Sequence, residues 1–212
     1  MKVSSSKEKI LKKIREALSN PVPLPFPKSE GSAGVFPGPD KDLEILFAEE
    51  FVKLSGKFAF CFDEQDAINQ LHLLITQRKW TKVFSKEKEV LPFFNPSLLT
   101  DDLQNCDVAI TSCHHLVART GSMVLSSKQQ HGRTTSVYAP LHICMAYTDQ
   151  LVFDTKDALK SLKETFGNLP SSVTFAAGPS RTADIEKTLV IGIHGPKEVY
   201  VFLIDRQNPR ED

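Results

Sequence analysis

The residues with the clearest chemical potential lie in one short segment, GPSRTADIEKTLVIGIHGP, at positions 178–196. It places an Arg, an Asp, a Glu and a His among three glycines and two prolines, between two apolar runs. Arg181 can hold a carboxylate or phosphate through two parallel hydrogen bonds. A helical turn begun by Ser180 or Thr182 would offer free N–H groups to the same anion. The segment is therefore either an anion site or an elaborate turn.

Acidic groups and a histidine complete this segment. Asp184 and Glu186 would repel an anion, so we expect them to orient Arg181 or to hold the turn. His194 stands next to Gly195, where bare backbone lets a ligand or another chain approach closely. Its imidazole could move a proton or simply hold a loop carbonyl. The candidate ligand-binding residues here are Gly178, Ser180, Arg181, Thr182, Asp184, Glu186, His194 and Gly195.

A second polar segment covers residues 113–143. The run Arg119-Thr120-Gly121-Ser122 would place hydroxyls and open N–H groups at a strand edge, and Arg133 follows in a glycine-containing loop. These five residues are further candidates for holding an anion. Adjacent residues such as Cys113-His114-His115 seldom converge on one ion, and no third ligand follows at a regular spacing. We therefore predict no metal site.

Composition excludes several classes of protein. The chain of 212 residues has 26 basic and 26 acidic side chains, and a formal net charge of zero argues against nucleic-acid binding. No apolar run approaches the roughly 20 residues that span a bilayer, and the charged N-terminus lacks a signal-peptide core. None of the four cysteines is paired at CxxC spacing. We expect a cytoplasmic protein, with no membrane insertion and with no iron–sulfur cluster or other cofactor of its own.

The chain divides by pattern at about residue 40. Residues 4–18 fit an amphipathic helix, and residues 21–40 hold six prolines and three glycines. We expect residues 1–40 to form a helix and an extended strap that docks a partner or a second copy of the chain. Residues 41–212 are then expected to form a single domain.

The second part alternates helix and strand patterns. Runs at 57–62, 107–111 and 199–205 are apolar on both faces, which is typical of strands covered by helices on both sides. Residues 121–147 (GSMVLSS, SVYAP and HICMAY) give three short strand-like runs, and VTFAA at 173–177 is expected to complete the sheet with the final strand. This order predicts an α/β fold with three layers, α/β/α, and a mostly parallel sheet.

Two further features follow from this fold prediction. A helix is expected over 155–168, with Thr155 as its N-cap. Ligands of such sheets bind beyond the carboxyl ends of the strands, which draws attention to the loops after Phe62, Thr111 and Ala177. The sequence has neither a GxGxxG nor a Walker A motif, so it lacks the usual dinucleotide and P-loop fingerprints.

The run GPSRTADIEKTLVIGIHGPKEVYVFLID at 178–205 closely resembles the C-terminal signature of the lactate-utilization (LUD) domain family, in particular its protein C type. Residues 120–125, Arg133 and His142-Ile143 are similar to the family's middle segment. The resemblance covers essentially the whole chain and is strongest over its second half. It implies a fold similar to the CoA-transferase and sugar-phosphate-isomerase superfamily. It also implies a part in oxidising L-lactate to pyruvate beside two iron–sulfur companion proteins, which would carry the clusters.

One position departs from the family pattern. Family members commonly have an acidic residue before Thr-Gly, whereas this chain has Arg119, which reverses the local charge. The leading hypothesis is a component of a lactate-oxidising system that binds a small anionic ligand at the strand ends. An independent enzyme of the sugar-phosphate isomerase or acyl-CoA transferase type is the alternative, with Asp184 or Glu186 as the required carboxylate. A non-catalytic assembly subunit is the third possibility.

Overall fold

The computed structural model describes residues 38–130, 132–182 and 190–206, together with Lys12 and Arg15. Contacts divide the chain into two units, Met1–Gly38 and Pro39–Asp212, and only the second is described further. Lys12 and Arg15 are helical, while the rest of the helix expected over 4–18 and most of the proline-rich strap lie outside the described residues. Within the part of the chain that the structure describes, no helix is long and apolar enough to cross a membrane.

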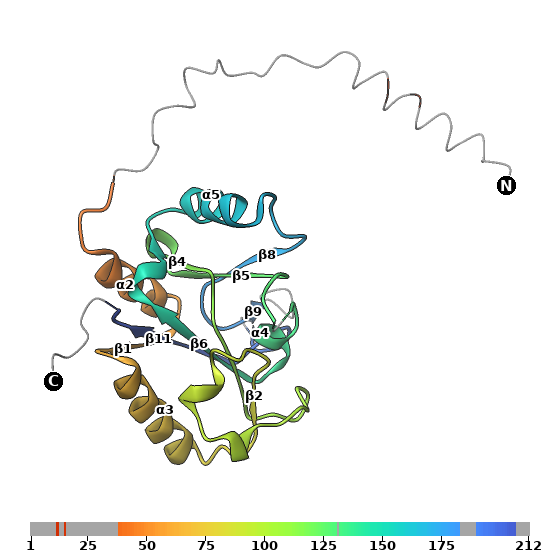
Figure 1. Ribbon diagram of the computed structural model, residues 1–212. Coiled ribbons are helices and arrows are strands. Elements are labelled where there is room, and N and C mark those ends of the chain that lie inside the picture. The colour runs from red at the N-terminus through yellow and green to blue at the C-terminus, as the bar shows by residue number, and fades with distance from the viewer. Residues whose placement is uncertain (1–11, 13–14, 16–37, 131, 183–189, 207–212) are drawn as a thin grey trace, which may run out of the picture. The chain divides into compact units, whose positions relative to one another are not determined.

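A five-stranded parallel sheet forms the centre of the second unit (Figure 1). Its strands run in the order β1-β11-β6-β3-β2, and every neighbouring pair is parallel. The strands are β1 (Lys57–Cys61), β2 (Val83–Phe84), β3 (Val108–Thr111), β6 (Leu141–Tyr147) and β11 (Glu198–Ile204). Because all five are parallel, their amino ends share one edge of the sheet and their carboxyl ends share the other. The predicted α/β class is confirmed.

We expected a single sheet, but a second sheet of four strands packs against one face of the first. Its order is β7-β4-β5-β8, with β5 antiparallel to both β4 and β8. The chain reverses direction at residues 118–121, so β5 pairs back onto β4 instead of entering the parallel sheet. The strands are β4 (His115–Val117), β5 (Ser122–Ser126), β7 (Leu151–Val152) and β8 (Val173–Ala176); β9 (Arg181–Thr182) and β10 (Val190–Ile191) form a separate antiparallel pair.

Aspartate side chains cap the amino ends of two of the helices, α3 and α5. Asp63 accepts the N–H of Asp66 at 2.7 Å and begins α3, and Asp154, not the expected Thr155, caps α5.

The expected strand SVYAP instead forms one turn of helix, because the Thr134 carbonyl accepts the N–H of Tyr138 at 2.9 Å. The α-helices are α2 (Leu43–Lys53), α3 (Glu64–Arg78), α4 (Thr135–Tyr138) and α5 (Thr155–Phe166); 3-10 turns are η1 (Leu91–Phe93), η2 (Pro96–Leu98), η3 (Ala118–Thr120) and η4 (Thr148–Gln150).

Both faces of the parallel sheet are covered, which explains its two-sided apolar strands. On one face, Leu71 and Ile75 of α3 pack with sheet residues such as Ile143. On the other, Phe47 and Phe51 of α2 and the inner face of the second sheet cover the strands. Helix α5 covers the outer face of the second sheet (Figure 1). The structure therefore has an additional layer beyond the three that the sequence predicts.

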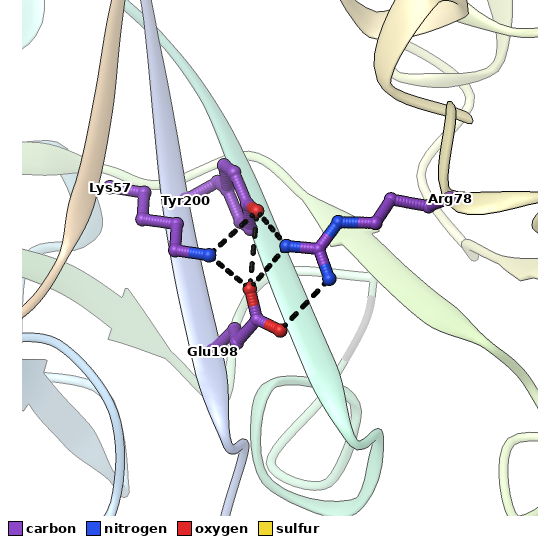
Figure 2. Close-up of polar contacts among 4 residues, drawn as sticks. All are labelled: Lys57, Arg78, Glu198 and Tyr200. Atoms are coloured by element: carbon purple, nitrogen blue, oxygen red, sulfur yellow. Dashed lines mark hydrogen bonds and ion pairs between the residues drawn. The ribbon is translucent and has the colours of Figure 1, made fainter. Parts of the chain in front are cut away.

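A cluster of four polar side chains holds the amino ends of β1 and β11 to the end of α3 (Figure 2). Glu198 lies between Lys57 and Arg78, and Arg78 donates to its two carboxylate oxygens at 2.8 and 3.2 Å. The hydroxyl of Tyr200 accepts from Arg78 at 2.8 Å and donates to Glu198 at 3.2 Å. Partial burial opposes ionisation, but the two cations hold the pKa of Glu198 below its ordinary value. The cluster is thus a charged clamp between three elements.

Replacing Glu198 with Gln leaves two neighbouring cations without a counter-charge. We expect Glu198→Gln to lower the free energy of unfolding by about 1–2 kcal/mol, measured by urea denaturation at neutral pH. Glu164→Gln is the matched control, because its pair with Lys160 at 3.9 Å is solvent-exposed and should contribute under about 0.5 kcal/mol. Equal effects of the two substitutions would contradict the clamp.

Candidate functional site

The described residues of the segment 178–196, which contains Arg181, lie at the amino edge of the parallel sheet. Ser180 N donates to the Pro196 carbonyl at 3.0 Å, just before β11, and Lys197 N donates to the Pro140 carbonyl at 2.8 Å, just before β6. We expected the loop after Ala177 at the carboxyl edge. The expectation is wrong because the preceding strand, β8, belongs to the second sheet and delivers the chain to the opposite end.

Strands β9 and β10 of this segment form an antiparallel pair. Thr182 pairs with Val190, and Gly192 N donates to the carbonyl of Ser180 at 3.0 Å. Ser180 therefore does not begin a helix, because Arg181 and Thr182, which follow it, form strand β9. A helical turn begun by Thr182 would lie outside the described residues. Asp184 and Glu186 lie outside the described residues.

The two polar segments found in the sequence converge on the C-terminal end of α2. A Cβ on Gly121 would lie 2.5 Å from Phe51 N, and one on Gly178 would lie 2.7 Å from the Leu54 carbonyl oxygen. Both glycines have positive φ, +57° and +99°. Arg181 donates to the same Leu54 carbonyl and, at 2.8 Å, to the hydroxyl of Ser55. The glycines admit the helix backbone, and Arg181 donates to one carbonyl group at the helix end, that of Leu54.

Two substitutions separate the cost of the steric clash at Gly121 from the cost of its positive φ. Gly121→Ala combines an unfavourable positive φ with a clash against the α2 backbone, and should lower the free energy of unfolding by about 2–4 kcal/mol. Gly132→Ala has a similar φ of +66° and nothing within 4 Å, so it should cost only about 1 kcal/mol. Denaturant unfolding measures both. A Gly121→Ala cost equal to that of Gly132→Ala would exclude the close contact.

Arg119 forms an ion pair within the second sheet layer and lines neither of the two cavities described below. Its Nε and Nη2 atoms donate to the two carboxylate oxygens of Asp154 at 3.1 and 3.2 Å. These contacts lower the pKa of Asp154 to about 2, in part together with Thr155. Since Asp154 is the N-cap of α5, Arg119 fixes the start of that helix. The positive charge at this position therefore has a structural partner.

The remaining upstream candidates also make local contacts. Thr120 donates its hydroxyl to Ser122 at 2.9 Å, Arg133 donates to the Ser171 hydroxyl at 2.7 Å, and buried His142 hydrogen-bonds Thr111 at 2.8 Å. Of the predicted residues, His194 and Gly195 line a cavity at the amino edge. The sequence candidates therefore do not assemble into one anion site among the described residues.

The Arg119–Asp154 pair predicts a loss of stability in acid. The folded pKa of about 2 lies below the ordinary value near 3.9, so the pair contributes fully above pH 4 and is lost as pH falls toward 2. Urea unfolding from pH 5 to pH 2 should show about 2 kcal/mol from this group. Asp154→Asn should remove that component, whereas the exposed control Asp149→Asn should retain it. Identical pH profiles for wild type and Asp154→Asn would refute the assignment.

A cavity of about 390 Å³ lies at the opposite, carboxyl edge of the parallel sheet. It is built by loops that follow β2, β3, β5, β6 and β11, so five separate stretches of chain converge on it. This is where open parallel sheets bind ligands. The lining residues are Glu89, Val90, Phe93, Ser112, Cys113, His114, His115, Gln129, Met145, Tyr147, Asp149, Gln150 and Arg206.

Ser112 is held at one wall of this carboxyl-edge cavity. Its N–H and its side chain hydrogen-bond the buried carboxylate of Glu87, and Gln129 donates to its hydroxyl oxygen at 3.2 Å. Burial raises the pKa of Glu87, while the bonds from Ser112 oppose that shift. A fixed hydroxyl next to a buried carboxyl group can orient a polar ligand or share a proton with it.

Gln150 positions two more groups at the cavity. Its backbone carbonyl, which can only accept, lies 3.3 Å from Nδ1 of His115, so Nδ1 carries the hydrogen. Burial lowers the pKa of His115, which keeps the ring neutral at pH 7 and leaves Nε2 as an acceptor. The side chain of Gln150 donates to the Cys113 carbonyl at 2.6 Å and accepts from Tyr147 N at 2.7 Å.

One cation stands among the cavity's lining residues. Arg206 donates to Asp149 at 2.7 Å and lies 4.1 Å from the centre of the Tyr147 ring, whose hydroxyl donates to Glu64 at 2.7 Å. The pair neutralises the charge of Asp149 and keeps a guanidinium at the cavity. Among the described residues, no group of three or more His, Cys, Asp or Glu side chains could hold a metal ion.

The sequence pattern indicated the loop after Thr111 but not three polar residues that line the cavity there. Ser112, Gln129 and Gln150 follow strands β3, β5 and β6 at intervals that form no motif. They share only their location just after a strand. That location indicates a common site only when the order and direction of the strands are known.

A family model described as the LUD domain matches residues 46–204. The chain belongs to this family. The LUD-domain protein is 29% identical to lactate utilization protein C of Oceanobacillus iheyensis over 77% of its own length and 66% of that relative. It is 32% identical to lactate utilization protein C of Bacillus subtilis over 49% of its own length and 45% of that relative.

The LUD-domain protein thus spans about half to two thirds of the length of these relatives. Its fold is similar to the crystal structure of a DUF162 family protein from Deinococcus radiodurans, with a TM-score of 0.60 and 15% identity. That match covers 76% of this chain and 96% of the other, and at this identity it supports the fold alone.

Proposed function

We propose that this chain is a cytoplasmic component of an L-lactate utilization system, in which lactate is oxidised to pyruvate together with iron–sulfur partner proteins. Membership of the LUD domain family and the names of two relatives support the pathway. The cysteines support the division of labour, because the four free thiols are all buried and separate from any cluster motif. In this proposal the clusters are on the partners.

We further propose that the carboxyl-edge cavity binds the small anionic ligand. One observation carries this proposal: polar side chains from five loops converge beyond the carboxyl ends of the parallel strands. Arg206 is paired with Asp149 through Nη1 and can offer its other guanidinium N–H groups to a carboxylate, while Ser112 and Gln129 supply hydrogen bonds. Val90, Phe93 and Met145 give an apolar wall suited to a methyl group. A 2-hydroxy or 2-oxo carboxylate matches these three requirements.

A second candidate function is catalysis by this chain itself. The buried carboxyl group of Glu87 favours it: Glu87 does not line the cavity itself but bonds Ser112, which does, and burial raises its pKa, as suits a group that exchanges a proton with a substrate hydroxyl through Ser112. This carboxyl takes the place of Asp184 and Glu186 as the most suitable base among the described residues. Glu87→Gln should abolish turnover without loss of ligand binding if this candidate is correct.

Ligand binding and growth together test the proposal. Arg206→Gln should weaken binding of L-lactate or pyruvate about tenfold in calorimetric titrations, because a charge-assisted hydrogen bond contributes about 1–2 kcal/mol. Ser112→Ala should weaken it by a smaller factor. The same variants should restore growth on L-lactate poorly in a strain that lacks the gene and has no second lactate-oxidising route.

Control experiments distinguish the proposed role in L-lactate utilization from the proposed ligand binding at the carboxyl-edge cavity. Arg133→Gln removes an exposed Arg outside the cavity and should bind and rescue as wild type does. Normal growth of the deletion strain on L-lactate would overturn the pathway. Full rescue and unchanged binding by both cavity variants would leave the pathway intact and exclude this cavity as its ligand site.

A further inference from the structure

A second cavity, of about 560 Å³, lies at the amino edge of the parallel sheet. One wall is the loop from Gly192 to Lys197, which precedes β11, and the other is the run from Val137 to Pro140, which precedes β6. The carboxyl-edge cavity lies beyond the other ends of the same two strands. Seven residues of extended chain separate the two edges by roughly 20 Å, so the cavities are distinct sites.

Two nitrogen-bearing side chains, one of them a lysine, line this amino-edge cavity. Lys197 and His194 line it, and no acidic side chain is among the described residues that do so. In the described part of the chain, neither side chain has a hydrogen-bond or ion-pair partner. The backbone of Gly192 lies close against the aliphatic stem of Lys197, at a φ of +79°. The stem is therefore in contact with backbone, while the ammonium group has no partner among the described residues.

Apolar side chains form the other part of the cavity. Val137, Tyr138 and Ile193 line it with 39%, 63% and 43% of their surfaces exposed, and Ile191 beside them is 49% exposed. An exposed cluster of large apolar groups commonly marks a place where a ligand or partner binds. A ligand that fits here must offer both an apolar body and an anionic group.

We propose that the amino-edge cavity binds an amphiphilic organic anion, meaning an acid group attached to an aromatic or acyl body. The acid group contacts Lys197 and His194, and the body packs on Tyr138, Val137 and Ile193. Lactate and pyruvate have no body that could cover these side chains. The site therefore takes a different class of ligand from the carboxyl-edge cavity, and it does not depend on the function proposed above.

Two matched fluorescent probes test this inference. The first is 8-anilinonaphthalene-1-sulfonate, an aromatic anion, and the second is N-phenyl-1-naphthylamine, which has the same rings without the charge. We expect one saturable sulfonate site on the full-length protein. Lys197→Gln should weaken sulfonate binding about tenfold and leave the neutral probe unchanged, since only the charged contact is lost. Tyr138→Ala should weaken both probes.

Two control variants test whether the effects are specific to the amino-edge cavity. Lys128→Gln and Leu73→Gln alter an exposed cation and an exposed apolar residue elsewhere on the surface and should change neither titration. Thermal unfolding checks that each variant is folded. Absence of a saturable site, or sulfonate binding that Lys197→Gln and Tyr138→Ala leave unchanged, would overturn the proposal. Equal loss of both probes in Lys197→Gln would also overturn it, because the charge would then not select the ligand.

Discussion

The parallel pairing of β11 with β1 on one side and β6 on the other is the constraint on which the rest of this structure depends. Parallel strands separate their two ends completely, because every strand enters at one edge and leaves at the other. Loops that follow the strands gather at the carboxyl edge, and those that precede them gather at the amino edge. The two cavities are consequences of this separation.

The C-terminal end of α2 ties the two sheets together. Gly121 of the second sheet and Gly178 after β8 both pack against its backbone, and Arg181 bonds the Leu54 carbonyl between them. Such a contact needs small residues at the approach and a donor for the open carbonyl groups. Gly178 and Arg181 of the family-like segment thus have a structural role at the end of α2.

Much of the fold could be predicted because it depends on local patterns. The apolar strands, the helix over 155–166 and the glycine after it follow from periodicity and capping. The second sheet could not be predicted, because β5 and β8 have the same apolar pattern whichever sheet they join. The role of Arg119 was equally hidden, since its partner Asp154 lies 35 residues away and belongs to another element.

The sequence by itself determined the family, the α/β class and the elements that carry the conspicuous residues. Only the tertiary structure decided which edge of the sheet each residue occupies. Arg181 and His194 lie at the amino edge, while Ser112, Gln129 and Gln150 meet at the carboxyl edge. The physical reason is that strand order and direction are set by long-range pairing and packing, and no short stretch of sequence contains that information.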